Sequence, residues 1–126
     1  MSFLLDTHVL VWWVTDDPRL SAHARARIEG RDEECIVSAV TAFELATKAR
    51  LGKLPAAAEL ADGFEQLVER EGFSSLSIST EHGLRAGRLA GRDPFDRLLA
   101  AQSLTEGLAI MTSDPAFRVL GVTTAW

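Results

Sequence analysis

The segment from Phe3 to Val14 reads FLLDTHVLVWWV, and it decides the fold class. Its first three residues are an apolar run that predicts a short buried strand. The residues from Thr7 onward predict a helix that is apolar nearly all round, and Asp6 stands between the two elements. A strand that passes directly into a helix is typical of an α/β fold.

The same alternation continues along the chain. Further apolar strands are expected over residues 35–37, 76–78, 108–111 and 122–124. Helices are expected from a cap at Ser21 to Gly30, over 39–51 and 56–71, from a cap at Thr80, over 95–106, and as a short turn after Asp114-Pro115. This order predicts a three-layer α/β/α domain around a mostly parallel sheet of about four to five strands. Residues 1–126 show no repeat, low-complexity tract or linker, so we expect a single domain.

The composition is that of an ordinary globular chain, with 47% hydrophobic and 25% charged residues. The one cysteine, Cys35, leaves no internal disulfide, which fits a reducing compartment. The first apolar run follows no basic residues and stops at Asp6, so it does not read as a signal peptide. No stretch approaches the roughly 18 apolar residues that a membrane span needs. We therefore expect a cytoplasmic protein without a membrane partner.

The charge balance limits how the chain can bind nucleic acid. With 13 basic and 18 acidic residues the net charge is −5, which argues against binding through bulk positive potential. If RNA is the substrate, bound divalent cations and clustered arginines must offset the acid. Arg85, Arg88 and Arg92 recur at helical spacing and could contact phosphates, although a solvated charged face is the simpler interpretation. Arg97 is the better candidate for a phosphate contact, but it could equally pair with Asp93.

Two carboxylates follow predicted strands directly. Asp6 ends the first strand, and Asp114 comes just after the strand at 108–111. In parallel sheets, ligands bind outside the carboxyl ends of the strands, so both side chains are expected at one edge of the sheet. Each could instead cap the helix after it. That alternative is strong for Asp114, which precedes a proline, and weaker for Asp6, because Thr7 could take the capping position.

Glu44 is the only charged residue between Glu34 and Lys48, and its neighbours on the expected helix are apolar. An ionised carboxylate in such surroundings is costly unless it is paired or bound to a metal. Lys48 lies four residues further on, so a helical ion pair is the alternative to a site role.

The stretch Asp93-Pro94-Phe95-Asp96 places two more acids at the start of a helix. Asp93 fits the capping position and Pro94 the first helical position, and the helix dipole favours both acids. We assign Asp93 to the cap. Asp96 lies inside the first turn and is followed by apolar residues, so it is the candidate site residue.

Together these candidates form a set of oxygen ligands without a paired histidine or cysteine, which suits Mg²⁺ or Mn²⁺. Such an ion can lower the pKa of a bound water, orient it and stabilise charge on a phosphoryl oxygen during in-line attack. The histidines offer no rival site, because His8, His23 and His82 are far apart and lack zinc-ligand spacing.

Two other classes of protein also use such acids. A non-catalytic interaction module could use them as a pocket for a basic peptide or a metal, and calorimetric titration with Mg²⁺ or Mn²⁺ would separate it from an enzyme. A phosphoryl-transfer receiver or phosphatase also places Asp at strand ends. The sequence counts against it, because Asp6 belongs to no acidic pair and no lysine follows a late strand.

Four short motifs carry a resemblance to a known family. They are Leu5-Asp6-Thr7-His8, Phe43-Glu44-Leu45, the stretch from Asp93 to Gln102, and Thr112-Ser113-Asp114. In this order they resemble the PIN-domain family and, more narrowly, the VapC-type toxins of toxin–antitoxin pairs. Phe43 departs from the pattern, since these toxins often carry Trp there.

The resemblance implies a PIN-like fold and a metal-dependent endoribonuclease, the toxin of a type II toxin–antitoxin pair. It implies that Mg²⁺ or Mn²⁺ is held by Asp6, Glu44, Asp96 and Asp114. Hydroxyls of Thr7 and Thr112 are then expected near a metal-bound water or phosphate. It further implies 5′-phosphate and 3′-hydroxyl products, a homodimer, and a cognate antitoxin whose tail covers the groove.

Overall fold

The computed structural model describes residues 2–126, and within them five strands form one parallel sheet in the order β3-β2-β1-β4-β5. The strands are β1 (Ser2–Leu5), β2 (Glu34–Ser38), β3 (Ser74–Leu76), β4 (Ala109–Met111) and β5 (Thr124–Ala125). The helices are α1 (Thr7–Val14), α2 (Ala22–Gly30), α3 (Ala39–Leu51), α4 (Ala57–Asp62), α5 (Phe64–Glu71), α6 (Thr80–Arg88), α7 (Pro94–Glu106) and α8 (Ala116–Val119).

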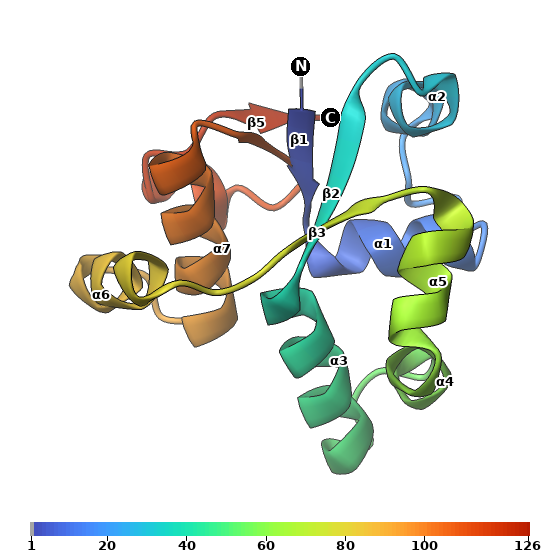
Figure 1. Ribbon diagram of the computed structural model, residues 1–126, viewed down its shortest axis with the longest axis horizontal. Helices are drawn as coiled ribbons and strands as arrows, with labels where there is room; N and C mark the ends of the chain where they lie inside the picture. Colours follow the sequence, from blue (N-terminus) through green and yellow to red (C-terminus); the bar gives the residue numbers. More distant parts are fainter. Residues whose placement is uncertain (1) are drawn as a thin grey trace.

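The central strand β1 holds the layers together because its apolar side chains alternate between the two faces of the sheet. Phe3 and Leu5 pack on one face with apolar residues of α1, α2 and α5. Leu4 packs on the other face with residues of α7 and α8, and α6 lies outside α7. Figure 1 shows the two groups of helices on either side of the sheet. The α/β/α prediction is confirmed, and every strand pair is parallel.

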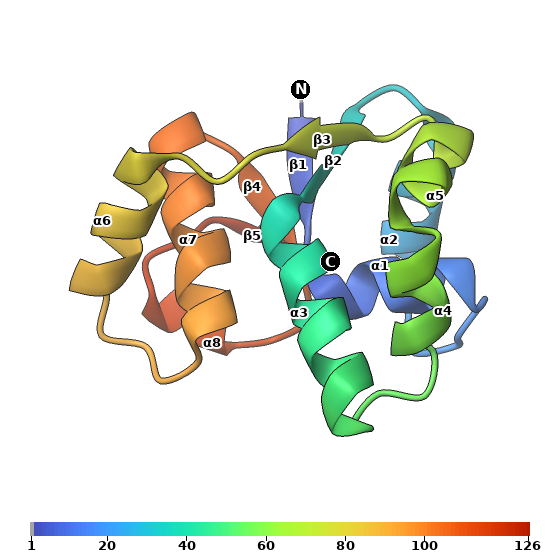
Figure 2. The same cartoon turned by 60° about the horizontal axis from the view of Figure 1, so that its bottom comes forward.

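Helix α3 begins where β2 ends and extends beyond the edge of the sheet. It contacts α7 on one side and α4 on the other (Figure 2). A third apolar cluster, which includes Val11, Leu45 and Leu60, fills the space between α1, α3 and α4. Helix α3 therefore separates α7 on one side from α4 on the other and packs against both.

Three of the predicted elements differ by more than one residue from those in the structure. The helix expected over 56–71 is two helices, because Gly63 leaves the helical conformation at φ −106° and ψ 21°. A glycine inside a helical pattern favours such a break, since it loses the most conformational freedom when it is held helical. The strand expected at 76–78 lies at 74–76, and Ile78 is 41% exposed. The last strand, expected at 122–124, is Thr124–Ala125.

The cap of α6 also differs. Ser79 is the capping residue in place of Thr80: its hydroxyl accepts the backbone N–H of His82, whose Nδ1 accepts the N–H of Ser79. Sequence alone could not choose between adjacent hydroxyl residues. This histidine is buried and bonds to Glu106 at 3.0 Å, so it has a structural role.

Among residues 2–126, no helix is both long and apolar enough to cross a bilayer.

Candidate active site

Asp6 lies at the point where the order of strands reverses. From β1 the chain continues to β2 on one side of the sheet, and β4 lies on the other side. Leu5 pairs with Met111 in the ladder, and the backbone N–H of Asp6 donates to the Met111 carbonyl at 3.1 Å. Ligands of open parallel sheets bind at such a reversal, outside the carboxyl ends of the strands. The topology thus places Asp6 where the sequence predicted a site.

Thr112 joins Asp6 to Asp114. Its hydroxyl donates to Oδ2 of Asp6 at 2.8 Å and accepts the backbone N–H of Asp114 at 3.0 Å. The Asp6 carboxylate is buried and, within the described chain, makes no capping hydrogen bond to α1. Asp114 is exposed, and its Oδ1 accepts the N–H of Ala116 at 2.9 Å. The capping role left open for Asp114 is met only in part: Asp114 bonds the first residue of α8, but Pro115 takes the capping position, and in the described chain Asp6 makes no such bond.

Glu44 lies in the second turn of α3 and is 3% exposed, as its apolar neighbours predicted. Lys48 donates to its Oε2 at 2.6 Å, so the helical ion pair left open by the sequence is formed. The Lys48 side chain is itself only 23% exposed. The pair explains how the carboxylate is tolerated here.

Asp96 lies in the first turn of α7 and is half-buried. Asp93 caps this helix, accepting the backbone N–H of Phe95 at 2.8 Å, as predicted. Because the cap is occupied by Asp93, the Asp96 carboxylate is free of that role.

Neighbouring acids act electrostatically on Asp6 and on Asp96. Burial raises the pKa of Asp6, the Thr112 hydroxyl and His8 oppose this, and Glu44 and Asp114 raise it further. Burial also raises the pKa of Asp96 to about 7, and four acids add to the effect: Asp93, Asp6, Asp114 and Glu44. We call Asp6, Glu44, Asp96 and Asp114 the acidic floor. In residues 2–126, however, no three or more histidine, cysteine or acidic side chains form a group that could hold a metal ion as they stand.

Two buried hydroxyl contacts that the sequence did not predict fix α3 in place. Thr7 and Thr41 share a hydrogen bond of 3.0 Å between α1 and α3, and both are fully buried. Ser38, which caps α3, donates to Oε1 of Gln102 on α7. The predicted phosphate contact of Thr7 does not fit this arrangement, because its hydroxyl is occupied and shielded. Gln102 could have been noticed as an amide that ends an apolar run.

Arg97 follows Asp96 on α7 and is half-buried. Among the described residues its side chain forms no ion pair, so the alternative pairing with Asp93 is not made. Its Nε is buried and has no hydrogen-bond partner within residues 2–126. Arg85 instead donates to the Thr105 hydroxyl at 3.2 Å, away from the acidic floor.

Comparison with known proteins agrees with this architecture. The family model of the PIN domain matches residues 3–122, so the chain belongs to the PIN-domain family. Within that family it is a VapC-type member. It is 33% identical to Ribonuclease VapC22 of Mycobacterium tuberculosis over 118 residues, which cover 91% of this chain and 88% of that protein.

Two further matches span most of the chain. The tRNA(fMet)-specific endonuclease VapC of Shigella flexneri is 25% identical over 120 residues, covering 90% of this chain and 87% of that protein. The crystal structure of VapBC2 from Rickettsia felis, bound to a DNA fragment from its promoter, superposes with a TM-score of 0.71. At 14% identity it covers 99% of this chain and 98% of that one, and it shows that the fold is shared.

Proposed function

We propose that this protein is a metal-dependent endoribonuclease and the toxin of a type II toxin–antitoxin pair. The observation that carries the proposal is the acidic floor at the strand reversal of a PIN-family sheet. The names of its relatives, a ribonuclease and a tRNA-specific endonuclease, support RNA as the substrate. The alternative, a non-catalytic module that binds a basic peptide, has no separate observation in its favour.

The donor set of the acidic floor fits Mg²⁺ or Mn²⁺. It offers only carboxylate oxygens, the ligands that these hard cations prefer. The pKa of Asp96, about 7 because of burial and four neighbouring acids, reflects negative charge that a divalent cation would neutralise. Asp6, Asp96, Glu44 and Asp114 would hold the ion, and Glu44 would exchange its Lys48 partner for it. When bound, the ion supplies an activated water and a Lewis acid for phosphodiester hydrolysis.

The remaining groups have positioning roles in this proposal. Thr112 holds the Asp6 carboxylate through its hydroxyl and fixes the Asp114 turn through the same atom. Arg97, which lacks an acidic partner in the described chain, neutralises a phosphate of the substrate. Cleavage on this route leaves 5′-phosphate and 3′-hydroxyl ends.

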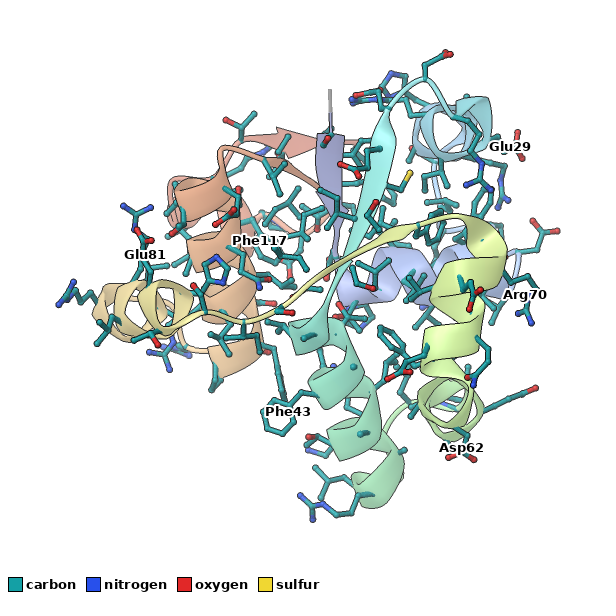
Figure 3. All side chains as sticks on the ribbon, in the orientation of Figure 1. Glu29, Phe43, Asp62, Arg70, Glu81 and Phe117 are labelled. Carbon is teal, nitrogen blue, oxygen red and sulfur yellow. The ribbon has the colours of Figure 1, made fainter. Side chains whose placement is uncertain are left out.

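The test uses purified protein freed of any partner, assayed on RNA with Mg²⁺, with Mn²⁺ and with EDTA. We expect cleavage with either metal and none with EDTA. Asp6→Asn should abolish cleavage without unfolding the protein, whereas Asp62→Asn, at an exposed acid on α4 (Figure 3), should leave it unchanged. Absence of cleavage under every metal condition, together with no calorimetric binding of Mg²⁺ or Mn²⁺, would support the interaction module instead.

We also propose an antitoxin partner, a homodimer and a cytoplasmic location. The VapBC2 structure from Rickettsia felis supports the first, since its name describes a complex. A helix as apolar as α1 could indicate an interface between two copies, but here it does not support the homodimer, because both of its tryptophans have partners in the same chain. Trp12 packs on Trp126 at 5.9 Å between ring centroids, and Trp13 donates to Glu71 at 3.3 Å. Light scattering of the isolated protein tests the homodimer.

A further inference from the structure

Two phenylalanines stand next in sequence to acids of the acidic floor. Phe43 immediately precedes Glu44 on α3, and Phe95 immediately precedes Asp96 on α7. Their ring centroids are 5.3 Å apart in an edge-to-face arrangement. Phe43 is 58% exposed, and Figure 3 shows it projecting from α3 on the side of α7. The exposed ring of Phe43 offers a flat surface on which a planar ligand can stack.

A hollow of about 350 Å³ lies beside this pair, between α3 and the start of α7. Phe95 lines it together with three cations, Lys48, Lys53 and Arg92. Lys48 and Lys53 are the only lysines in a chain whose net charge is −5. Among the described residues Lys53 and Arg92 form no ion pair, so their charges are available to a ligand.

The same hollow contains one acid, Asp93, and its charge is partly used within the protein. Oδ1 of Asp93 accepts the backbone N–H groups of Phe95 and, at 3.4 Å, of Asp96. The surface is therefore aromatic and cationic, whereas the acidic floor consists of carboxyl groups. A ligand that fits the aromatic rings and the cations of this surface has flat apolar rings and regularly spaced negative charges.

We propose that Phe43, Phe95, Lys53 and Arg92, here called the aromatic rim, bind an unpaired stretch of RNA next to the bond that is cleaved. One base stacks on Phe43, and the flanking phosphates contact Lys53 and Arg92. Aromatic side chains beside cations are the usual means of binding single-stranded nucleic acid. Bases inside a duplex are stacked on each other and cannot reach such a ring. The inference rests on the proposed ribonuclease function and specifies the form of its substrate.

Stacking is tested by fluorescence anisotropy of a short, unstructured, labelled RNA. All variants are made in the Asp6→Asn background, in Mg²⁺, so that the RNA is not cleaved during the measurement. Phe43→Leu should weaken binding by about 5- to 100-fold, because base–aromatic stacking contributes on that order. Phe43→Tyr keeps the ring and should bind like the parent. The control is Leu84→Ala on α6, since Leu84 is 57% exposed and lies outside the rim; it should have no effect.

The phosphate contacts are tested through the dependence of RNA affinity on salt. Each phosphate neutralised on a single strand contributes about −0.7 to the slope of log affinity against log salt. Lys53→Ala and Arg92→Ala should each reduce the slope by about this amount. Phe43→Leu should lower the affinity and leave the slope unchanged. Arg70→Ala, at an exposed arginine of α5 on the far side of the molecule (Figure 3), is the matched control and should leave the slope unaltered.

Three results would overturn the inference. They are equal affinity of Phe43→Leu and its parent, equal binding of the single strand and its duplex, and a Lys53→Ala slope equal to that of Arg70→Ala. Unchanged RNA affinity with weakened antitoxin binding would assign the aromatic rim to a protein partner. The proposed function is judged separately: cleavage by the unaltered protein and its loss in Asp6→Asn support it, whatever the rim variants do.

Discussion

On both α3 and α7, an acid of the floor stands next in sequence to an aromatic residue of the rim. Glu44 is 3% exposed, whereas Phe43, one residue earlier, is 58% exposed. Helix α3 therefore turns a charged group toward the interior and an apolar group toward solvent, the reverse of the usual distribution, whereas Phe95 and Asp96 on α7 are both half-buried. The difference teaches that the two surfaces affect stability differently. Burying the acids of the floor lowers the free energy of unfolding of the metal-free protein, whereas exposing the rim changes it little.

The strongest way to break this comparison is Asp6→Asn. If the acidic floor binds the catalytic ion, cleavage should fall at least about a thousandfold, because metal-based stabilisation contributes several kcal/mol. In EDTA the melting temperature should rise, since burial makes the charged form of Asp6 costly and raises its pKa. A variant that lost activity and also melted earlier in EDTA would contradict this account of the floor.

Thr112→Val tests whether the floor needs its buried hydroxyl. The variant keeps the shape of the side chain but removes the hydrogen bond to Asp6, so the Asp6 pKa should rise further. Groups that orient metal ligands typically contribute about 10- to 100-fold to metal affinity or activity. We expect a loss in that range by calorimetry and cleavage assay. Thr7→Val is the matched control: it removes the bond to Thr41, so it should lower stability and affect metal binding much less.

Lys48→Met distinguishes the effect of the Lys48 ammonium group on Glu44 from the effect of a bound metal ion. Removing Lys48 leaves the buried Glu44 carboxylate unpaired, and the free energy of unfolding without metal should fall by about 3–5 kcal/mol. Mg²⁺ affinity should rise, because the ion no longer competes with the ammonium group. Urea unfolding in EDTA and a calorimetric Mg²⁺ titration measure the two effects. A loss of metal affinity would show that Lys48 supports the site.

The pH dependence of stability reports on Asp96. Its pKa rises from an ordinary 3.8 to about 7 in the folded protein, so the folded state binds the proton more tightly. The resulting stabilisation is complete below the pKa of Asp96 in the unfolded state, and it is lost as pH rises through the pKa in the folded state. In EDTA the contribution of Asp96 should therefore make the melting temperature decline between about pH 4 and about pH 7. Asp96→Asn should flatten that decline, and Asp62→Asn should not.

The smallest effect is expected for the rim. Phe43→Ala should lower the free energy of unfolding by no more than about 1.5 kcal/mol, the usual upper contribution of an edge-to-face aromatic pair such as Phe43–Phe95. Urea unfolding measures it, and Leu84→Ala serves as the equally exposed reference. A large loss of stability would show that Phe43 belongs to the core, and the contrast between floor and rim would fail.

The sequence could predict what depends on neighbouring residues. Strand, acid and helix follow one another at Asp6, and the apolar surroundings of Glu44 are enough to indicate its burial. The cap at Asp93 follows from the same local rules. These features depend little on which distant segments meet in space.

Long-range contacts set the limit. Thr7 was expected at a phosphate, but its partner is Thr41, 34 residues away. Ser38 and Gln102 are separated by 64 residues, and neither side chain shows its partner in the sequence. The edge strand β3 was placed two residues late because a partly exposed strand carries a weak apolar pattern. The roles of Asp6, Glu44, Asp96 and Asp114 as metal ligands stay predictions.

The hydrogen bond between Thr112 and Asp6 also has a consequence for folding during translation. It joins residues 106 positions apart, and β1 must pair with β4 before it can form. Such distant pairings form slowly, and during translation the amino-terminal segments emerge long before β4. Asp6 is thus synthesised early, whereas its partner Thr112 is synthesised near the end of the chain. On the proposed function, the nascent chain would carry no complete cleavage site until β4 has been made.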